Sequence, residues 1–134
     1  MNTYTSLEQS KKLVELGLNP KTADMFYCYG MDVTATWDYD KEPTINGEEL
    51  HMDVCDIPCW SLGALLNAMP VNIIIDEVYR WNITPGYDGI LIDYENASYD
   101  NILKITAGKN LVEAAINMIT WLLENDYIKK YEAN

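Results

Sequence analysis

Basic residues are scarce in this sequence. Its 134 residues include nine Lys and Arg against 21 Asp and Glu, which gives a formal net charge of −12. Affinity for nucleic acids comes largely from cationic side chains that release counterions from the phosphates, and anionic membrane surfaces attract the same side chains. We therefore expect neither a nucleic acid nor a membrane as partner. Acidity favours solubility, and the alternative interpretation is an acidic mimic of nucleic acid that occupies another protein's basic groove.

Cysteine is also scarce, and long apolar runs are missing. The three cysteines, Cys28, Cys55 and Cys59, are an odd number and too few for the disulfide framework of a small secreted domain. No apolar run approaches the ~20 residues that span a bilayer, and residues 1–5 lack the basic and apolar regions of a secretion signal. These features together predict a protein of the reducing cytoplasm.

The most specific catalytic signatures are absent. The chain has no Gly-rich phosphate loop, no Gly-x-Ser-x-Gly turn and no His-Glu-x-x-His pair. Their absence counts against a nucleotide-dependent enzyme, a serine hydrolase and a zinc protease of that type. Other enzyme classes stay open, but no residue is assigned a catalytic role, and we expect a protein that is not an enzyme.

The composition predicts a single folded domain over residues 1–134. Apolar residues make up 49% of the chain and charged residues 22%, the proportions of an ordinary packed globule. The length fits one domain, and the sequence shows no linker, repeat or low-complexity tract.

The N-terminal residues predict a helical hairpin. Ser6 and Gln9 have the spacing of a capping box, and Gly17 is the residue type that ends helices in the left-handed conformation. Asn19 and Pro20 then have the order of an N-cap followed by a first helical residue. The second helix is expected to turn three residues inward: Ala23, Phe26 and Tyr27.

The pattern is weaker between residues 31 and 56. Acidic residues are frequent there, no helix is expected, and the β-branched run 33–37 is a candidate strand. The pattern sharpens again at Ser61, a candidate N-cap for a helix that Pro70 ends.

The C-terminal half predicts an antiparallel meander closed by a helix. Strand-like runs cover 71–81, 87–94 and 101–106, and connections this short exclude parallel crossovers. Asn110 is expected to cap an amphipathic helix that ends at 125–126, after which Tyr127 and Ile128 fold back onto the core. The predicted fold class is α+β: an N-terminal helical hairpin, an antiparallel sheet of three or more strands, and a closing helix packed on that sheet.

Three separate segments carry a resemblance to a known family. Residues 5–13 read TSLEQSKKL, residues 57–66 read IPCWSLGALL, and residues 121–125 read WLLEN. Together they resemble a family of small uncharacterised proteins from gut bacteria and their phages. That family has no assigned activity, so no functional residue carries over. The resemblance implies a cytoplasmic accessory protein of bacterial or prophage origin.

A second resemblance covers only the C-terminal part. The predicted meander is followed by residues 108–115, which read GKNLVEAA. This arrangement is similar to the βββα layout of HicB-type antitoxin domains, in which a Gly-x-Thr-x-x-Glu-Ala entry opens the closing helix. Asn110 stands where that entry has Thr, so the run also fits an ordinary capping box.

The single histidine lies near two cysteines. His51, Cys55 and Cys59 are spaced four residues apart, with Cys28 upstream, and thiolate and imidazole are the ligands that zinc prefers. Side chains at even spacing share one face of an extended segment. A zinc site at these four residues, or a thiol-dependent activity of Cys59 with His51, is therefore an alternative. The simpler interpretation is that the thiols are buried, since cysteine packs as a small hydrophobe, and no cofactor is expected.

Aromatic residues supply the leading functional hypothesis. The chain has four Trp and ten Tyr, and clusters of such side chains at the surface mark interfaces. Trp60 and Trp121 are expected in the core, whereas Trp37, Tyr39 and Tyr87 are the interface candidates. We therefore expect a non-enzymatic accessory protein that binds another protein through an exposed aromatic or acidic surface. The oligomeric state is left open.

Overall fold

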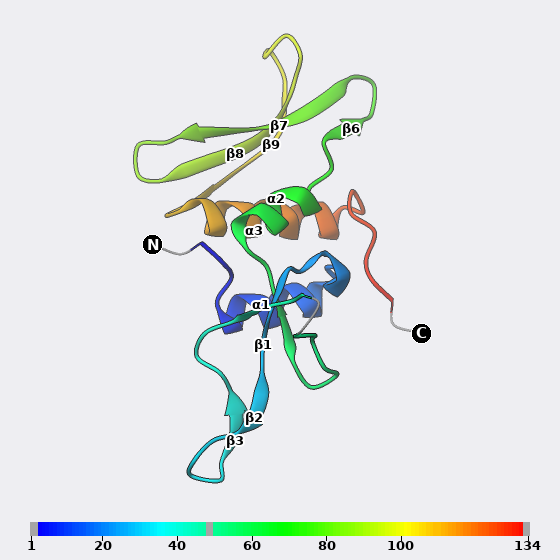
Figure 1. Cartoon of the computed structure of the whole chain (residues 1–134). Coiled ribbons are helices and arrows are strands. Elements are labelled where there is room, and N and C mark those ends of the chain that lie inside the picture. The colour runs from blue at the N-terminus through cyan, green and yellow to red at the C-terminus, as the bar shows by residue number, and fades with distance from the viewer. Residues whose placement is uncertain (1–2, 48–49, 133–134) are drawn as a thin grey trace.

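The computed structural model describes residues 3–47 and 50–132 and has an α+β fold (Figure 1). The helices are α1 (Leu7–Leu16), α2 (Leu62–Ala68), α3 (Leu111–Glu124) and the 3-10 turn η1 (Pro20–Thr22). The strands are β1 (Met25–Tyr27), β2 (Tyr29–Met31), β3 (Trp37–Tyr39), β4 (Thr44–Ile45), β5 (Ile57–Cys59), β6 (Asn72–Ile74), β7 (Val78–Pro85), β8 (Ile90–Asn96) and β9 (Ile102–Gly108).

The expected antiparallel meander is confirmed. Strands β6, β7, β8 and β9 pair in sequence order, every neighbouring pair antiparallel. The run 71–81 contains parts of two strands because the chain reverses between them, where the Ile75 amide donates to the Glu77 carbonyl at 3.1 Å. A register shift between Tyr94 and Glu95 interrupts the pairing of β8 with β9.

The closing helix packs on this sheet, as predicted. The Asn110 side chain accepts from the Glu113 amide at 2.9 Å and so caps α3. The buried face of α3 lies against β8 and β9 on one side, and α1 and α2 also contact this helix. After the helix ends, the Tyr127 amide donates to the Leu122 carbonyl at 2.9 Å, which turns the chain back onto the core. The core therefore lies around α3, between the sheet and α1 (Figure 1).

The predicted N-terminal helical hairpin is wrong in its second half. The first helix forms with the complete capping box of Ser6 and Gln9, and Gly17 ends it at a φ of +99°. Asn19 then caps a single 3-10 turn, and the chain continues as β1.

Long-range pairing explains this outcome. Strand β1 lies between β4 and β5, and Phe26 and Tyr27 are buried there as strand residues. The expectation that these two side chains point inward is therefore confirmed, although they do so from a sheet. Pairing with segments up to 34 residues away, as between Met25 and Cys59, overrode the local helix start.

The segment between residues 31 and 56 contains no helix within its described parts, 31–47 and 50–56, as expected. The candidate strand at 33–37 is instead the turn of a hairpin, because Ala35 has a φ of +62° and β3 begins only at Trp37. Ser61 caps α2, its hydroxyl accepting from the Ala64 amide at 3.2 Å. None of the helices in the described ranges has the length and apolar character needed to cross a bilayer.

Candidate functional site

The structure does not bring the histidine and the three cysteines together. Cys59 is fully buried at the end of β5, Cys28 is half-buried beside Thr44, and Cys55 and His51 are exposed. Within residues 3–47 and 50–132, no group of three or more His, Cys, Asp or Glu side chains is placed to hold a metal ion. The even spacing fails as a guide because residues 50–56 are not a strand, so their side chains do not alternate about one face.

Cys59 belongs to a buried network centred on Thr5. Its Sγ lies 3.3 Å from the Thr5 carbonyl oxygen and 3.5 Å from the Thr5 hydroxyl, and that hydroxyl also lies 2.7 Å from the Ser10 hydroxyl. The Tyr27 hydroxyl donates to the same Thr5 carbonyl at 2.8 Å. Burial raises the pKa of the Cys59 thiol, so the thiol form is favoured and the geometry is that of a structural cysteine.

The three thiols are therefore expected to react with a thiol reagent at very different rates. In native buffer at pH 8, Cys55 should be labelled first and Cys28 more slowly, while Cys59 should be labelled only in denaturant. Mass spectrometry of peptides from timed samples measures the three rates. Labelling of Cys59 as fast as Cys55 in the folded protein would contradict its place in the Thr5 network.

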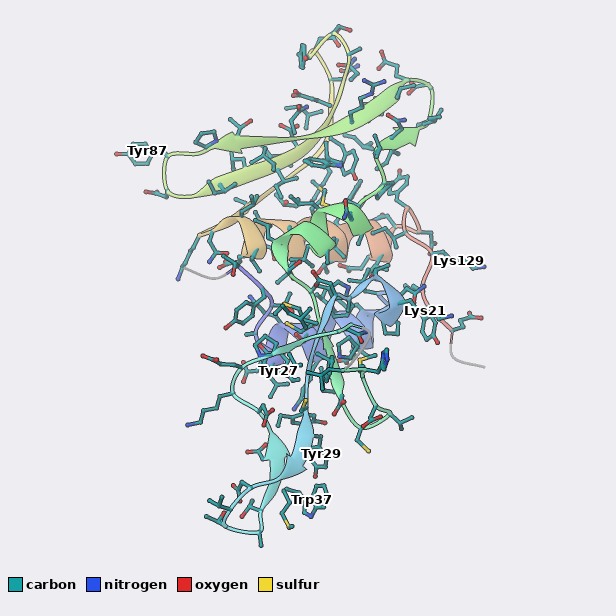
Figure 2. The ribbon with its side chains drawn as sticks, viewed as in Figure 1. Lys21, Tyr27, Tyr29, Trp37, Tyr87 and Lys129 are labelled. Carbon is teal, nitrogen blue, oxygen red and sulfur yellow. The ribbon has the colours of Figure 1, made fainter. Side chains whose placement is uncertain are left out.

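The β2–β3 hairpin carries an ordered aromatic cluster at the surface. Tyr29 pairs with Tyr39 and Met31 pairs with Trp37 across the two strands, so these four side chains lie on one face. The Tyr29 ring lies 5.7 Å from the Trp37 ring and 4.8 Å from the Tyr39 ring, measured between centroids. Trp37 is 60% exposed and Met31 59% exposed. We call Tyr29, Met31, Trp37 and Tyr39 the aromatic hairpin (Figure 2).

Polar contacts hold the aromatic hairpin in place. The Asp32 carboxylate accepts from the amides of Thr34 at 2.8 Å and Thr36 at 3.1 Å, which fixes the turn. The Thr34 hydroxyl also donates to this carboxylate. These hydrogen bonds, most of all the one from the Thr34 hydroxyl, lower the pKa of the Asp32 carboxyl. At the other end, the Tyr29 amide donates to Asp56 at 2.8 Å. The Lys11 ammonium of α1 lies 4.9 Å from the centre of the Tyr39 ring.

Negative charge is concentrated around this hairpin. Residues 24–56 contain nine Asp and Glu and one Lys, a net −8 of the −12 carried by the whole chain. Two of these acids, Glu48 and Glu49, lie outside the described residues. Six of the others are exposed: Asp24, Asp32, Asp38, Asp40, Glu42 and Asp53. Asp32 and Asp38 lie within the hairpin, Asp40 follows it directly and Asp56 accepts from the Tyr29 amide, so acidic side chains accompany the aromatic hairpin.

The other aromatic residues divide as follows. Trp60 is fully buried and Trp121 packs against the core beside Tyr127, as expected for both. Tyr87 is fully exposed, but it lies at the β7–β8 turn, at the opposite end of the molecule from the aromatic hairpin (Figure 2). Tyr29 and Met31 were not among the interface candidates, although their alternation with Gly30 is the period-two signal of a strand.

Comparison with known proteins provides no relative from which a role could be transferred. The chain matches no family model, no curated protein and no solved structure.

Proposed function

We propose that this chain is a non-enzymatic accessory protein that binds a basic partner protein through the aromatic hairpin and the acidic residues around it. The observation that carries the proposal is the exposed, stacked arrangement of Tyr29 and Trp37 on a hairpin with a fixed turn. The cytoplasmic location and the bacterial or prophage origin implied by the family resemblance are part of the same proposal.

The aromatic hairpin supplies the affinity in this account. Trp, Tyr and Met are enriched at the centres of protein interfaces, and Trp and Tyr are common among the residues that dominate binding energy. An exposed Trp37 gains the free energy of burial only when a partner covers it. Because the turn is already ordered, little conformational entropy remains to be lost on binding.

The surrounding charge supplies the selectivity. A net charge of −8 over residues 24–56 attracts a positively charged surface and repels an acidic one. Such complementarity mainly raises the association rate, and salt screens it. The partner is therefore a protein with Lys and Arg around an apolar recess that accepts Trp37.

An acidic mimic of nucleic acid is the second candidate, and the same concentration of charge favours it. A mimic would occupy a groove in which the partner binds DNA or RNA. It therefore predicts that nucleic acid competes with this protein for the partner, whereas an accessory protein that binds elsewhere leaves that affinity unchanged. The zinc and thiol alternatives gain no support from the dispersed positions of His51 and Cys55.

Photo-crosslinking tests the proposal without knowledge of the partner. A photoreactive amino acid is placed at Met31 in one variant and at Tyr87 in another, both side chains being exposed. In cells of the native host, the Met31 variant is expected to crosslink to one basic protein that the Tyr87 variant does not capture. The absence of any specific product at Met31, or the same products at both positions, would contradict the proposal.

A further inference from the structure

The chain segment before β5 forms a tight turn next to the aromatic hairpin. The Asp56 amide donates to the Asp53 carbonyl at 3.1 Å, so the two residues between them occupy the central positions of a hydrogen-bonded turn. Tyr27 at the end of β1 pairs with Ile57 at the start of β5, which places this turn next to the first residues of β2. The 53–56 turn and the β2–β3 turn project from the same end of the molecule (Figure 1).

One carboxylate connects this turn to the hairpin. The Oδ1 atom of Asp56 accepts from the Tyr29 amide at 2.8 Å, and its Oδ2 atom accepts from the Asp53 amide at 2.8 Å. Hydrogen bonds to an ionised carboxylate are stronger than those between neutral groups. Because both oxygens belong to one planar group, the turn is held in a fixed position relative to strand β2.

The 53–56 turn presents an apolar side chain that the rest of the described chain leaves uncovered. Val54, at one of its two central positions, is fully exposed. Burial of such a side chain against another protein is favourable, whereas in the free chain it contributes nothing to stability. Met31 and Trp37 of the aromatic hairpin are also largely exposed. Two ordered elements that share one carboxylate therefore offer apolar side chains at one end of the molecule.

We propose that the basic partner of the aromatic hairpin also covers the 53–56 turn and receives Val54 in a second apolar recess, with Asp56 as the positioning residue that holds turn and hairpin in one surface. This proposal rests on the function proposed above and extends it. The occupant is the same protein because exposed acids lie on both elements, Asp38 in the hairpin and Asp53 in the turn, and both attract Lys and Arg. Since both elements are ordered before binding, the second contact costs little further entropy.

Photo-crosslinking separates this proposal from the one on which it rests. The photoreactive amino acid is placed at Val54 in one variant and at Tyr99 in another, and the Met31 variant is the reference. In cells of the native host, the Val54 variant is expected to crosslink to the same basic protein as the Met31 variant. Capture at Met31 but not at Val54, or of a different protein at Val54, would overturn the extended surface and leave the proposed function intact. Capture at neither position would overturn both.

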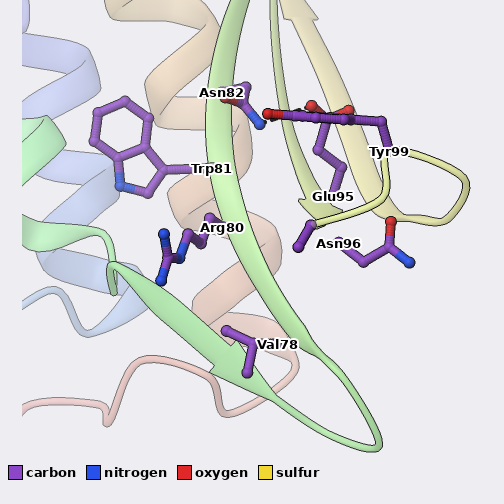
Figure 3. A pocket seen from close by; sticks show the side chains of 8 residues that line it. Val78, Arg80, Trp81, Asn82, Glu95, Asn96 and Tyr99 are labelled. Carbon is purple, nitrogen blue, oxygen red and sulfur yellow. Dashed lines mark hydrogen bonds between the residues drawn. The ribbon is translucent and has the colours of Figure 1, made fainter.

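Tyr99 is the matched control position, because it is also an exposed side chain on a fixed turn. It is 73% exposed, its φ is +59°, and its amide donates to the Asn96 carbonyl at 3.1 Å. The loop that carries it, between β8 and β9, lies at the opposite end of the molecule from the aromatic hairpin (Figure 1). Tyr99 borders a groove of about 420 Å³ whose lining includes one cation, Arg80, and one anion, Glu95 (Figure 3). Capture of the same protein at Tyr99 would show unspecific contact and overturn the proposal.

Asp56→Asn tests the positioning role, because an amide has one acceptor oxygen where the carboxylate has two. In the unbound protein, hydrogen exchange of the Tyr29 or the Asp53 amide should become about tenfold faster. The dissociation constant of the partner captured through Met31 should rise about tenfold. Asp53→Asn removes the same charge, but within the part of the chain that the structure describes its side chain accepts no hydrogen bond, so the expected loss is about twofold. Equal losses would contradict the role given to Asp56.

A double-mutant cycle distinguishes positioning from general damage to the fold. Val54→Ala is expected to weaken binding of the same partner about tenfold in the wild type, because buried methyl groups are lost. In the Asp56→Asn background the same substitution should weaken binding less than about threefold, since the turn no longer holds residue 54 against the partner. Fully additive losses would mean that Asp56 acts independently of the turn, and no loss from Val54→Ala in the wild type would overturn the second recess.

Discussion

Replacing Trp37 with alanine is expected to weaken the complex with the partner protein about 100-fold. Central Trp residues of an interface typically contribute about 2 to 4 kcal/mol when truncated, and a factor of 100 corresponds to about 2.7 kcal/mol. Trp37 is 60% exposed and its stacking partner Tyr29 lies on the same hairpin, so the core does not depend on it. The free energy of unfolding should change by no more than about 0.5 kcal/mol.

Tyr87→Ala is the matched control for this substitution. It also removes an exposed aromatic ring, but from the β7–β8 turn at the other end of the molecule (Figure 2). Isothermal titration calorimetry with the partner captured through Met31 gives the dissociation constants of the wild type and of both variants. Urea denaturation confirms that each variant is folded. If the Trp37 and Tyr87 variants bind equally well, the aromatic hairpin is not the binding surface.

Replacing Trp60 with alanine is expected to destabilise the fold by about 3 to 5 kcal/mol, the range for removing a large aromatic side chain from a core. Trp60 is fully buried, and its indole N–H donates to the Thr22 hydroxyl at 2.9 Å. Its backbone amide also donates to Thr5 at 3.1 Å. Typical domains have only about 5 to 15 kcal/mol of stability, so a large part of the total would be lost.

Trp60→Phe serves as the comparison, because it keeps an aromatic ring and removes the indole N–H. Its loss should be clearly smaller than that of the alanine variant, since less volume is removed. Urea titrations followed by far-ultraviolet circular dichroism measure both. A loss below about 1 kcal/mol for Trp60→Ala would mean that this side chain does not organise the core.

The features predicted correctly from sequence are those set by neighbouring residues. Ser6, Ser61 and Asn110 each cap a helix, because a short polar side chain satisfies amides only two or three positions ahead. The meander follows in the same way from short connections between apolar runs. By contrast, Phe26 lies in a strand because β4 and β5 flank it, and no local pattern contains that information.

The same distinction between local and long-range information applies to the candidate sites. Trp37 and Tyr39 were selected from sequence as interface candidates, but their contact with Tyr29 depends on the hairpin register. The spacing of His51 and Cys55 predicted a shared face only if the segment were extended, and it is not.

Native mass spectrometry of the protein, purified gently at low salt from its own host, tests the central claim most directly. The proposed function predicts that the 15.3 kDa chain carries the added mass of a second, basic polypeptide, and that the Trp37→Ala variant loses it. A bare chain under these conditions, or added mass that matches only a metal ion or a small molecule, would contradict the claim.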